Sequence, residues 1–381
     1  NTYALFAETM TALSGRGRAG FIVPTGIATD NSTKAYFDFL MREQRLASLF
    51  DFENRENIFP AVDSRQKFCL LTLARDAAEP AFVFFATDAR QLADERRRFT
   101  LTNADVERIN PNTRTAPIFR SNTDAELTKK IYASVPVLLD EGRGEAGNPW
   151  GISFTAMFHM SNDSGLFRTF RRLEADGATR EGTNWRGTNG EEWAPLYEAK
   201  MIHQFDSRWA TYEPDGETVR DCTDEEKGNP EFEPLSRYWV PGSSVEERLR
   251  AKGWTRRWLM GWRNVCRATD ERTFIASVFR LAGVGNSMPL MLLQTNSNFH
   301  LMICFYANLA SMLFDYNARQ KIGGINLNFF YLEQFPVLPL SFYLQEDVSF
   351  ILPRALELIY TSSALRPRSE EHTSELQSHS F

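Results

Sequence analysis

The chain has 381 residues, of which 43% are hydrophobic and 24% are charged, and its formal net charge at pH 7 is −6. This composition is typical of a soluble globular protein of two or three domains, and the acidic balance excludes a uniformly basic nucleic-acid-binding protein while allowing a local basic face. The four cysteines lie far apart and form neither a disulfide framework nor a zinc site of recognisable spacing, so we expect a cytoplasmic protein without a bound metal.

The first 88 residues predict an alternation of helices and strands. Apolar residues at helical spacing indicate a helix over 3–14, and the apolar run at 20–24 indicates a strand buried on both faces of a parallel sheet. A second helix is expected to run through Leu40 and Met41. Three more strands are predicted at 46–52, 67–73 and 81–86. This order is typical of the second half of an open α/β sheet.

Residues 89–195 form a region of different composition. Short charged helical turns are predicted at 94–98 and 124–132, and the segment 110–120 between them is too rich in Pro, Asn and Thr for a regular element. A loop rich in Gly, Asn and Thr follows at 177–190. We interpret this region as a helical and loop connector that wraps the first domain.

The third region, which begins at residue 196, is divided by charge. Residues 213–248 contain 4 Lys or Arg against 11 Asp or Glu, a sum of −7, whereas residues 251–280 contain 7 against 2, a sum of +5. The most apolar run, 301–314, is short for a membrane span and predicts a buried helix. With an aromatic run and a closing helix at 350–360, the region reads as an α+β domain without contact to a membrane.

A basic turn follows the apolar helix. Arg319, Gln320 and Lys321 precede the pair Gly323-Gly324, which permits close backbone approach. Cations beside such a turn could contact a nucleic-acid phosphate. The alternative is a helix C-cap whose cations are merely solvated.

Three tryptophans, at 254, 258 and 262, would share one face of a helix. The basic residues around them include Arg256, Arg257 and Arg263. Basic residues interleaved with aromatic ones fit nucleic-acid contact, with charges on phosphates and rings for stacking. The alternative is a tryptophan stripe buried in the core, with solvated arginines beside it.

Two polar groups have residue types that occur in functional sites. His203, Asp206 and Arg208 could form an acid–base cluster, but no nucleophile or metal partner accompanies them, which favours a structural network or a phosphate contact. Asp51 and Glu53 lie at a strand end, where ligands bind in open α/β sheets. A solvated strand end is the alternative.

Phe59 is the most specific candidate. It stands in the segment Ile58-Phe59-Pro60, which leads into the strand at 67–73. An aromatic residue on such a loop could be a hydrophobic plug, or a wall on which a flipped base stacks.

Several stretches resemble adenine-specific (N6) amino DNA methyltransferases. Residues 5–30, LFAETMTALSGRGRAGFIVPTGIATD, resemble the helix and strand that follow the catalytic motif of that family. Residues 49–73, LFDFENRENIFPAVDSRQKFCLLTL, resemble its later motif, which contains the aromatic residue that stacks on the extruded adenine. By this match Phe59 is the stacking residue. The later regions resemble the connector and the target-recognition region of large single-chain type II (type IIG-like) restriction–modification enzymes.

The resemblance implies a fold and an activity. Residues 1–88 would be the back half of a Rossmann-like, S-adenosylmethionine-dependent methyltransferase sheet, residues 89–195 the connector, and residues 196–366 a target-recognition domain that binds double-stranded DNA. Neither the glycine-rich cofactor turn nor the Asn-Pro-Pro-Tyr motif of the family occurs in the sequence. The resemblance therefore implies a fragment of a restriction–modification or phage-defence enzyme, inactive alone, whose cofactor-binding residues lie upstream.

Two alternatives stay open. The chain could be a DNA-specificity module that only binds, although such a module would not need the methyltransferase half-sheet. It could also be an unrelated α/β protein with an aromatic helical cap. The tail, 367–381, changes composition abruptly, so we expect it to be disordered and of non-native origin.

Overall fold

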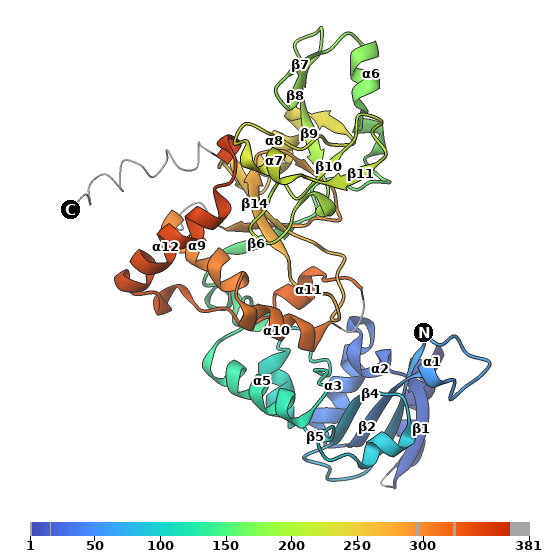
Figure 1. The fold of residues 1–381 in the computed structure, drawn as a ribbon. Helices are drawn as coiled ribbons and strands as arrows, with labels where there is room; N and C mark the ends of the chain where they lie inside the picture. The colour runs from blue at the N-terminus through green and yellow to red at the C-terminus, as the bar shows by residue number, and fades with distance from the viewer. Residues whose placement is uncertain (1, 16, 294–297, 323–324, 366–381) are drawn as a thin grey trace. The chain divides into compact units, whose positions relative to one another are not determined.

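The computed structural model describes residues 2–15, 17–293, 298–322 and 325–365 (Figure 1). The Gly323-Gly324 turn and the tail 367–381 lie outside these residues. The contacts divide the chain into two compact units. The first contains the described residues of Asn1–Asn148, Tyr316–Gly323 and Phe330–Val337, and the second contains the others. The predicted connector is thus shared, since its residues up to Asn148 pack within the first unit.

The first unit is built on a five-stranded sheet with the order β1-β3-β2-β4-β5. Its strands are β1 (Ala19–Pro24), β2 (Leu46–Glu53), β3 (Lys67–Leu73), β4 (Ala81–Ala86) and β5 (Phe99–Thr100). Strand β3 is antiparallel to both β1 and β2, and β4 is parallel to β2. Strands β1, β2 and β4 therefore run in the same direction.

One part of the strand prediction is wrong. The segment 20–24 does form a strand, but β1 pairs with an antiparallel neighbour and is not buried on both faces. Val23 is 6% exposed, whereas Ile22 is 54% exposed. The reason is long-range pairing, because β3 returns to lie beside β1 and helices cover only one of its faces.

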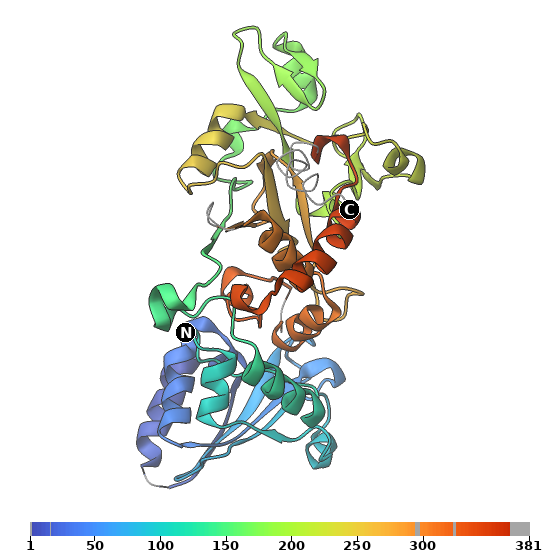
Figure 2. The same cartoon turned by 90° about the vertical axis from the view of Figure 1, so that its left-hand side faces the viewer.

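Helices cover one face of this sheet (Figure 2). They are α1 (Thr2–Ser14), α2 (Gly26–Thr29), α3 (Lys34–Arg42), α4 (Asn103–Ile109) and α5 (Asn122–Ser134). Their apolar residues form one large core with Leu49, Leu71 and Phe82 of the strands. Alternate strand residues, such as Phe52 and Val83, point to the other face and form a much smaller cluster. The predicted helical turn at 94–98 is a hydrogen-bonded turn.

The second unit is a mixed α+β assembly of several sheets. One sheet has the order β14-β13-β16-β6, another has the order β12-β9-β8-β7 with β15 parallel to β9, and β10 and β11 form a hairpin. The strands are β6 (Ile152–Thr155), β7 (Thr179–Glu181), β8 (Asn184–Arg186), β9 (Glu192–Tyr197), β10 (Ala210–Tyr212), β11 (Val219–Asp221), β12 (Trp239–Pro241), β13 (Trp258–Trp262), β14 (Ala276–Arg280), β15 (Gly283–Val284) and β16 (Leu290–Leu293). The mixed α/β and α+β class expected from the sequence is confirmed.

The helices of this region include the predicted buried one. They are α6 (Phe170–Ala175), α7 (Asp224–Gly228), α8 (Gly242–Arg250), α9 (Phe299–Leu309), α10 (Met312–Lys321), α11 (Phe329–Leu332) and α12 (Gln345–Ile359), and the residues of α10 and α11 are divided between the units. Helix α9 is buried as expected, but it ends at Leu309. Among the described residues no helix is both long and apolar enough to span a membrane.

The helix expected around the tryptophans is a strand. Trp258 and Trp262 begin and end β13, and Trp254 lies in the loop before it. All three are at most 4% exposed, so the alternative of a buried stripe is correct. A spacing of four residues puts side chains on one face of either a helix or a strand, which is why the pattern did not distinguish the two.

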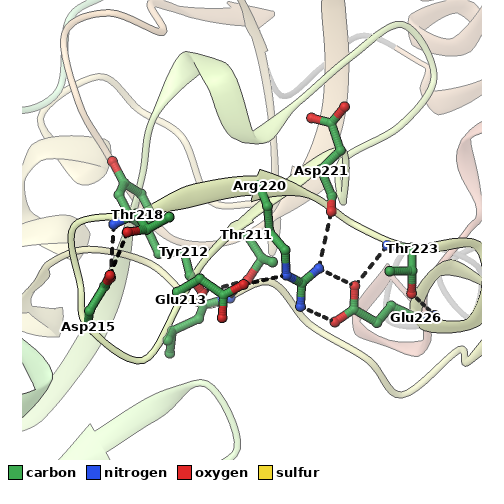
Figure 3. A network of polar contacts seen from close by, with 10 residues as sticks. Thr211, Tyr212, Glu213, Asp215, Thr218, Arg220, Asp221, Thr223 and Glu226 are labelled. Atoms are coloured by element: carbon green, nitrogen blue, oxygen red, sulfur yellow. Dashed lines mark hydrogen bonds and ion pairs between the residues drawn. The ribbon is translucent and has the colours of Figure 1, made fainter.

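In the acidic region 213–248, Arg220 bonds to two glutamates (Figure 3). Arg220 of the β10–β11 hairpin donates from Nε to Glu213 at 2.7 Å and from Nη2 to Glu226 at 2.7 Å. Glu226 also accepts the backbone N–H of Thr223 in a capping box at the start of α7. These acidic side chains therefore hold the hairpin and α7 together.

Candidate functional site

The strand directions of the first unit define one edge as the candidate site. Because β1, β2 and β4 are parallel to one another, their carboxyl ends lie at the same edge. The register agrees, since Pro24 is opposite Phe68, and Phe52 is opposite both Phe68 and Ala86. Open α/β sheets bind ligands at the carboxyl ends of their strands. We call this the carboxyl edge.

Phe59 lies at this edge, in the loop 54–66 that joins β2 to β3. The loop is held by Asn54, which is fully buried. Its Nδ2 donates to the carbonyls of Phe59 at 3.0 Å and Val62 at 2.8 Å, and its Oδ1 accepts the N–H of Phe59 at 2.9 Å. Asn54 had no predicted role. An Asn directly after a strand, where its amide can organise a turn, is the signal that could have found it.

The ring of Phe59 borders a hollow. It packs edge-on against Phe68, with ring centres 4.9 Å apart, and Phe68 stacks on Phe52 at 5.3 Å. Phe59 remains 37% exposed. The hollow has a volume of about 450 Å³ and is lined by Ile22, Phe52, Glu56, Ile58, Phe59, Phe68, Leu70, Thr87, Asp88 and Ala89. A ring supported from behind and open in front has the geometry that a stacking wall requires.

Asp51 connects three strands inside the same edge. It is 1% exposed, and its Oδ1 accepts the hydroxyl of Thr25 at 2.5 Å while its Oδ2 accepts the N–H of Phe85 at 2.9 Å. Burial raises the pKa of this carboxyl, and the two hydrogen bonds oppose that shift. Asp51 is therefore not a solvated strand end, and both of its oxygens are already bonded.

The carboxylates at this edge already have partners inside the chain. Each oxygen of Asp51 accepts one hydrogen bond, and Glu53 pairs with Arg55 at 2.7 Å and with Lys67 at 3.3 Å. The residues that this chain places at the edge can therefore pack and hydrogen-bond, and no cofactor contact is assigned to them. Within the described ranges, no cluster of three His, Cys, Asp or Glu is arranged to hold a metal.

Two of the residues predicted to contact DNA are buried in the first unit. Lys321 is 7% exposed, and its Nζ donates to the carbonyl of Ile109 at 2.7 Å and to that of Gln334. The ammonium also lies 4.8 Å from the centre of the Tyr132 ring. Burial lowers the pKa of Lys321 well below its ordinary value. In this arrangement Lys321 does not face a phosphate. Gln320 is 9% exposed, and Arg319 is partly exposed.

Arg208, in the second unit, is also buried. It is 2% exposed, and its guanidinium donates only to backbone carbonyls. The acceptors are Lys227 at 2.7 Å, Asn229 at 2.7 Å, Phe232 at 3.1 Å, and Thr361. Its geometry supports the structural interpretation and leaves no donor for DNA.

The other predicted arginines of the second unit differ in exposure. Arg263 donates from Nε to the carbonyl of Ile202 at 2.8 Å, and burial lowers its pKa. Arg256 is partly exposed and lies 5.9 Å from the centre of the Trp258 ring. Arg257 is exposed. Of these three, Arg257 is the most open to solvent.

The His203–Asp206 turn is a structural network. The two residues exchange backbone hydrogen bonds of 2.7 and 3.0 Å, and Phe205 between them has a φ of 64°. Lys227 pairs with Asp206 at 2.9 Å. The His203 ring lies against Trp209, with centres 4.4 Å apart, and burial lowers its pKa. These contacts within the fold agree with the structural alternative.

Comparison with solved structures gave weak likenesses, among them a type IIG enzyme and a type I R-M system. The type IIG restriction endonuclease BpuSI matches over 93% of this chain and 44% of its own, with a TM-score of 0.33 and 12% identity. A chain of a type I R-M system matches over 92% of this chain and 68% of its own, with a TM-score of 0.21 and 12% identity. The chain thus spans less than half the length of BpuSI, and likenesses this weak carry no argument about function. No protein-family model and no curated protein matches the sequence.

Proposed function

We propose that this chain is part of a site-specific DNA adenine-N6 methyltransferase of a restriction–modification or phage-defence enzyme. The sequence resemblance over 5–30 and 49–73 supplies the family. The observation that carries the proposal is Phe59, which Asn54 holds at the carboxyl edge, beside a hollow, with its ring backed by Phe68.

In this proposal the enzyme binds double-stranded DNA and turns the target adenine out of the helix. The base then stacks on Phe59, a contact worth about 1–3 kcal/mol by analogy with other base–aromatic pairs. The rigid loop keeps the ring in place, so the base is positioned without reorganising the protein. S-adenosylmethionine would supply the methyl group, and residues outside this chain would hold it.

The test is the Phe59→Ala variant in the enzyme that joins this chain to a cofactor-binding half. Loss of the stacking wall is expected to lower the rate of DNA adenine methylation by about 5- to 150-fold, which corresponds to the free energy of one stack. The measurement is transfer of a tritiated methyl group to DNA.

Val62→Ala is the matched control, because Val62 is 43% exposed on the same loop but does not line the hollow. An unchanged rate in Phe59→Ala would remove Phe59 from the site. If the joined enzyme bound DNA but never methylated it, the alternative of a non-catalytic specificity module would replace this proposal.

A further inference from the structure

A second feature of the carboxyl edge lies on its helix-covered side. Phe85, near the end of β4, has a φ of 60°, in the left-handed region that aromatic residues rarely adopt. The register between β2 and β4 shifts at this point, between Phe50 and Phe52. The buried carboxylate of Asp51 holds the N–H of Phe85 in place. Bulges and left-handed residues that neighbouring groups enforce in this way concentrate at functional sites.

Two cations lie over the ring that this bulge presents. The Nζ of Lys67 is 4.6 Å from the centre of the Phe85 ring, and the Cζ of Arg120 is 4.2 Å from it. Lys67 also pairs with Glu53. Arg120 is exposed, and it has no ion pair within the described residues. The ring therefore orients the guanidinium of Arg120 without neutralising its charge.

The cations distinguish Phe85 from Phe59. The Phe85 ring is in contact with two cations, whereas the Phe59 ring borders the hollow. What the group presents outward is positive charge, and a planar guanidinium is suited to bind a phosphate through two N–H donors. Asp51 is bonded to Thr25 and Phe85, and Glu53 is shared between Arg55 and Lys67, so the positive charge that the group presents is chiefly that of Arg120.

The strand geometry relates this group to Phe59. Lys67 and Phe68 are successive residues at the start of β3, so their side chains point to opposite faces of the sheet. Lys67 reaches Phe85, and Phe68 supports Phe59. A nucleotide that lies across the carboxyl edge would thus meet an aromatic wall on one side and cations on the other.

We infer that Arg120 and Lys67, seated on Phe85, bind a backbone phosphate of the DNA strand that carries the flipped adenine. The inference rests on the proposed function and adds a phosphate contact to it. The contact is independent of sequence, so it would position the strand and leave recognition to other residues.

The experiment measures binding of the full chain to a fluorescein-labelled DNA duplex by anisotropy, at a series of salt concentrations. Each phosphate contact contributes about 0.9 to the slope of log K against log salt. Arg120→Ala is therefore expected to reduce the slope by about 0.9, so that its affinity deficit shrinks about threefold between roughly 50 and 200 mM salt. Arg120→Lys keeps the charge and should retain the slope.

Arg42→Ala is the matched control, because Arg42 is an exposed arginine of the same unit that pairs with Asp38 at 3.1 Å and does not line the hollow. It removes the same charge and should leave the slope unchanged. A wild-type slope in Arg120→Ala, with salt-dependent binding by the wild-type chain, would overturn the phosphate contact and leave the proposed function standing. A wild-type chain with no affinity for DNA would overturn both. An equal reduction in Arg42→Ala would show a general charge effect and would also overturn the contact.

Discussion

In the second unit the guanidinium of Arg208 donates to four backbone carbonyls, whereas in the first unit that of Arg120 rests on an aromatic ring and is open to solvent. Both are arginines of a chain with a net negative charge, and both are candidates for DNA contact by residue type. The two arginines differ in the partners that their guanidinium N–H groups already have. A cation that is buried and bonded to backbone carbonyls supports the fold, and one held by a ring keeps its donors for a ligand.

The largest effect is expected at Arg208. Arg208→Met would remove the hydrogen bonds that the buried guanidinium donates to four backbone carbonyls, and we expect the free energy of unfolding to fall by about 3 kcal/mol or more. Urea denaturation followed by tryptophan fluorescence measures it. Arg257→Met, at an exposed arginine of the same unit, should change stability by at most about 0.5 kcal/mol. If Arg208→Met lowered the free energy of unfolding by less than about 1 kcal/mol, Arg208 would not be the structural cation described above.

Lys321, also buried, allows the structural role of a buried cation to be tested through the pH dependence of stability. Its pKa is lowered by burial in the folded protein, so between that pKa and the ordinary value of about 10.4 the unfolded chain binds more protons. Stability should therefore rise with pH across this window, by at most about 1.4 kcal/mol per pH unit. Lys321→Met should abolish this contribution, as denaturation at a series of alkaline pH values would show. Equal pH profiles for the two proteins would contradict a pKa of Lys321 that burial lowers.

A much smaller loss of stability than at Arg208 is expected at Arg120. An exposed cation–aromatic contact contributes about 0.5–1 kcal/mol, so Arg120→Ala should lower the free energy of unfolding by no more than that. The same urea denaturation measures it. Together with the reduced salt slope, this result would separate a ligand-binding cation from a structural one. A loss as large as that of Arg208→Met would place Arg120 among the structural cations.

In the first unit, the sequence predicted the positions of the strands better than it predicted which strands pair with one another. The strands at 46–52, 67–73 and 81–86 are compact apolar runs and are found within a residue of those bounds. The pairing of β1 with β3 could not be read locally, because residues some fifty positions apart decide it. The tryptophan spacing failed for another reason, since four residues suit both a helix and a strand.

The candidate site was predicted in the same uneven way. Phe59 was selected through the resemblance, and its stacking role stays a prediction, while its position at the carboxyl edge follows from the local pattern of a loop between two strands. The burial of Arg208 and Lys321 was not found, because their acceptors lie far along the chain, at Thr361 and Ile109. The cations on Phe85 were missed as well, since a β-bulge that turns one ring leaves no periodic signal.

The antiparallel position of β3 has a consequence for how such a site can vary. Because β3 returns between β1 and β2, the loop 54–66 leaves the sheet and re-enters it at the same edge. Its length can change without moving any strand, in the way that surface loops on a rigid scaffold tolerate insertions. The hydrogen bonds between the Asn54 side chain and the backbone of Phe59 must be kept. The other residues of the loop can therefore be exchanged as a unit. Such an exchange would change the shape of the hollow and leave the sheet intact.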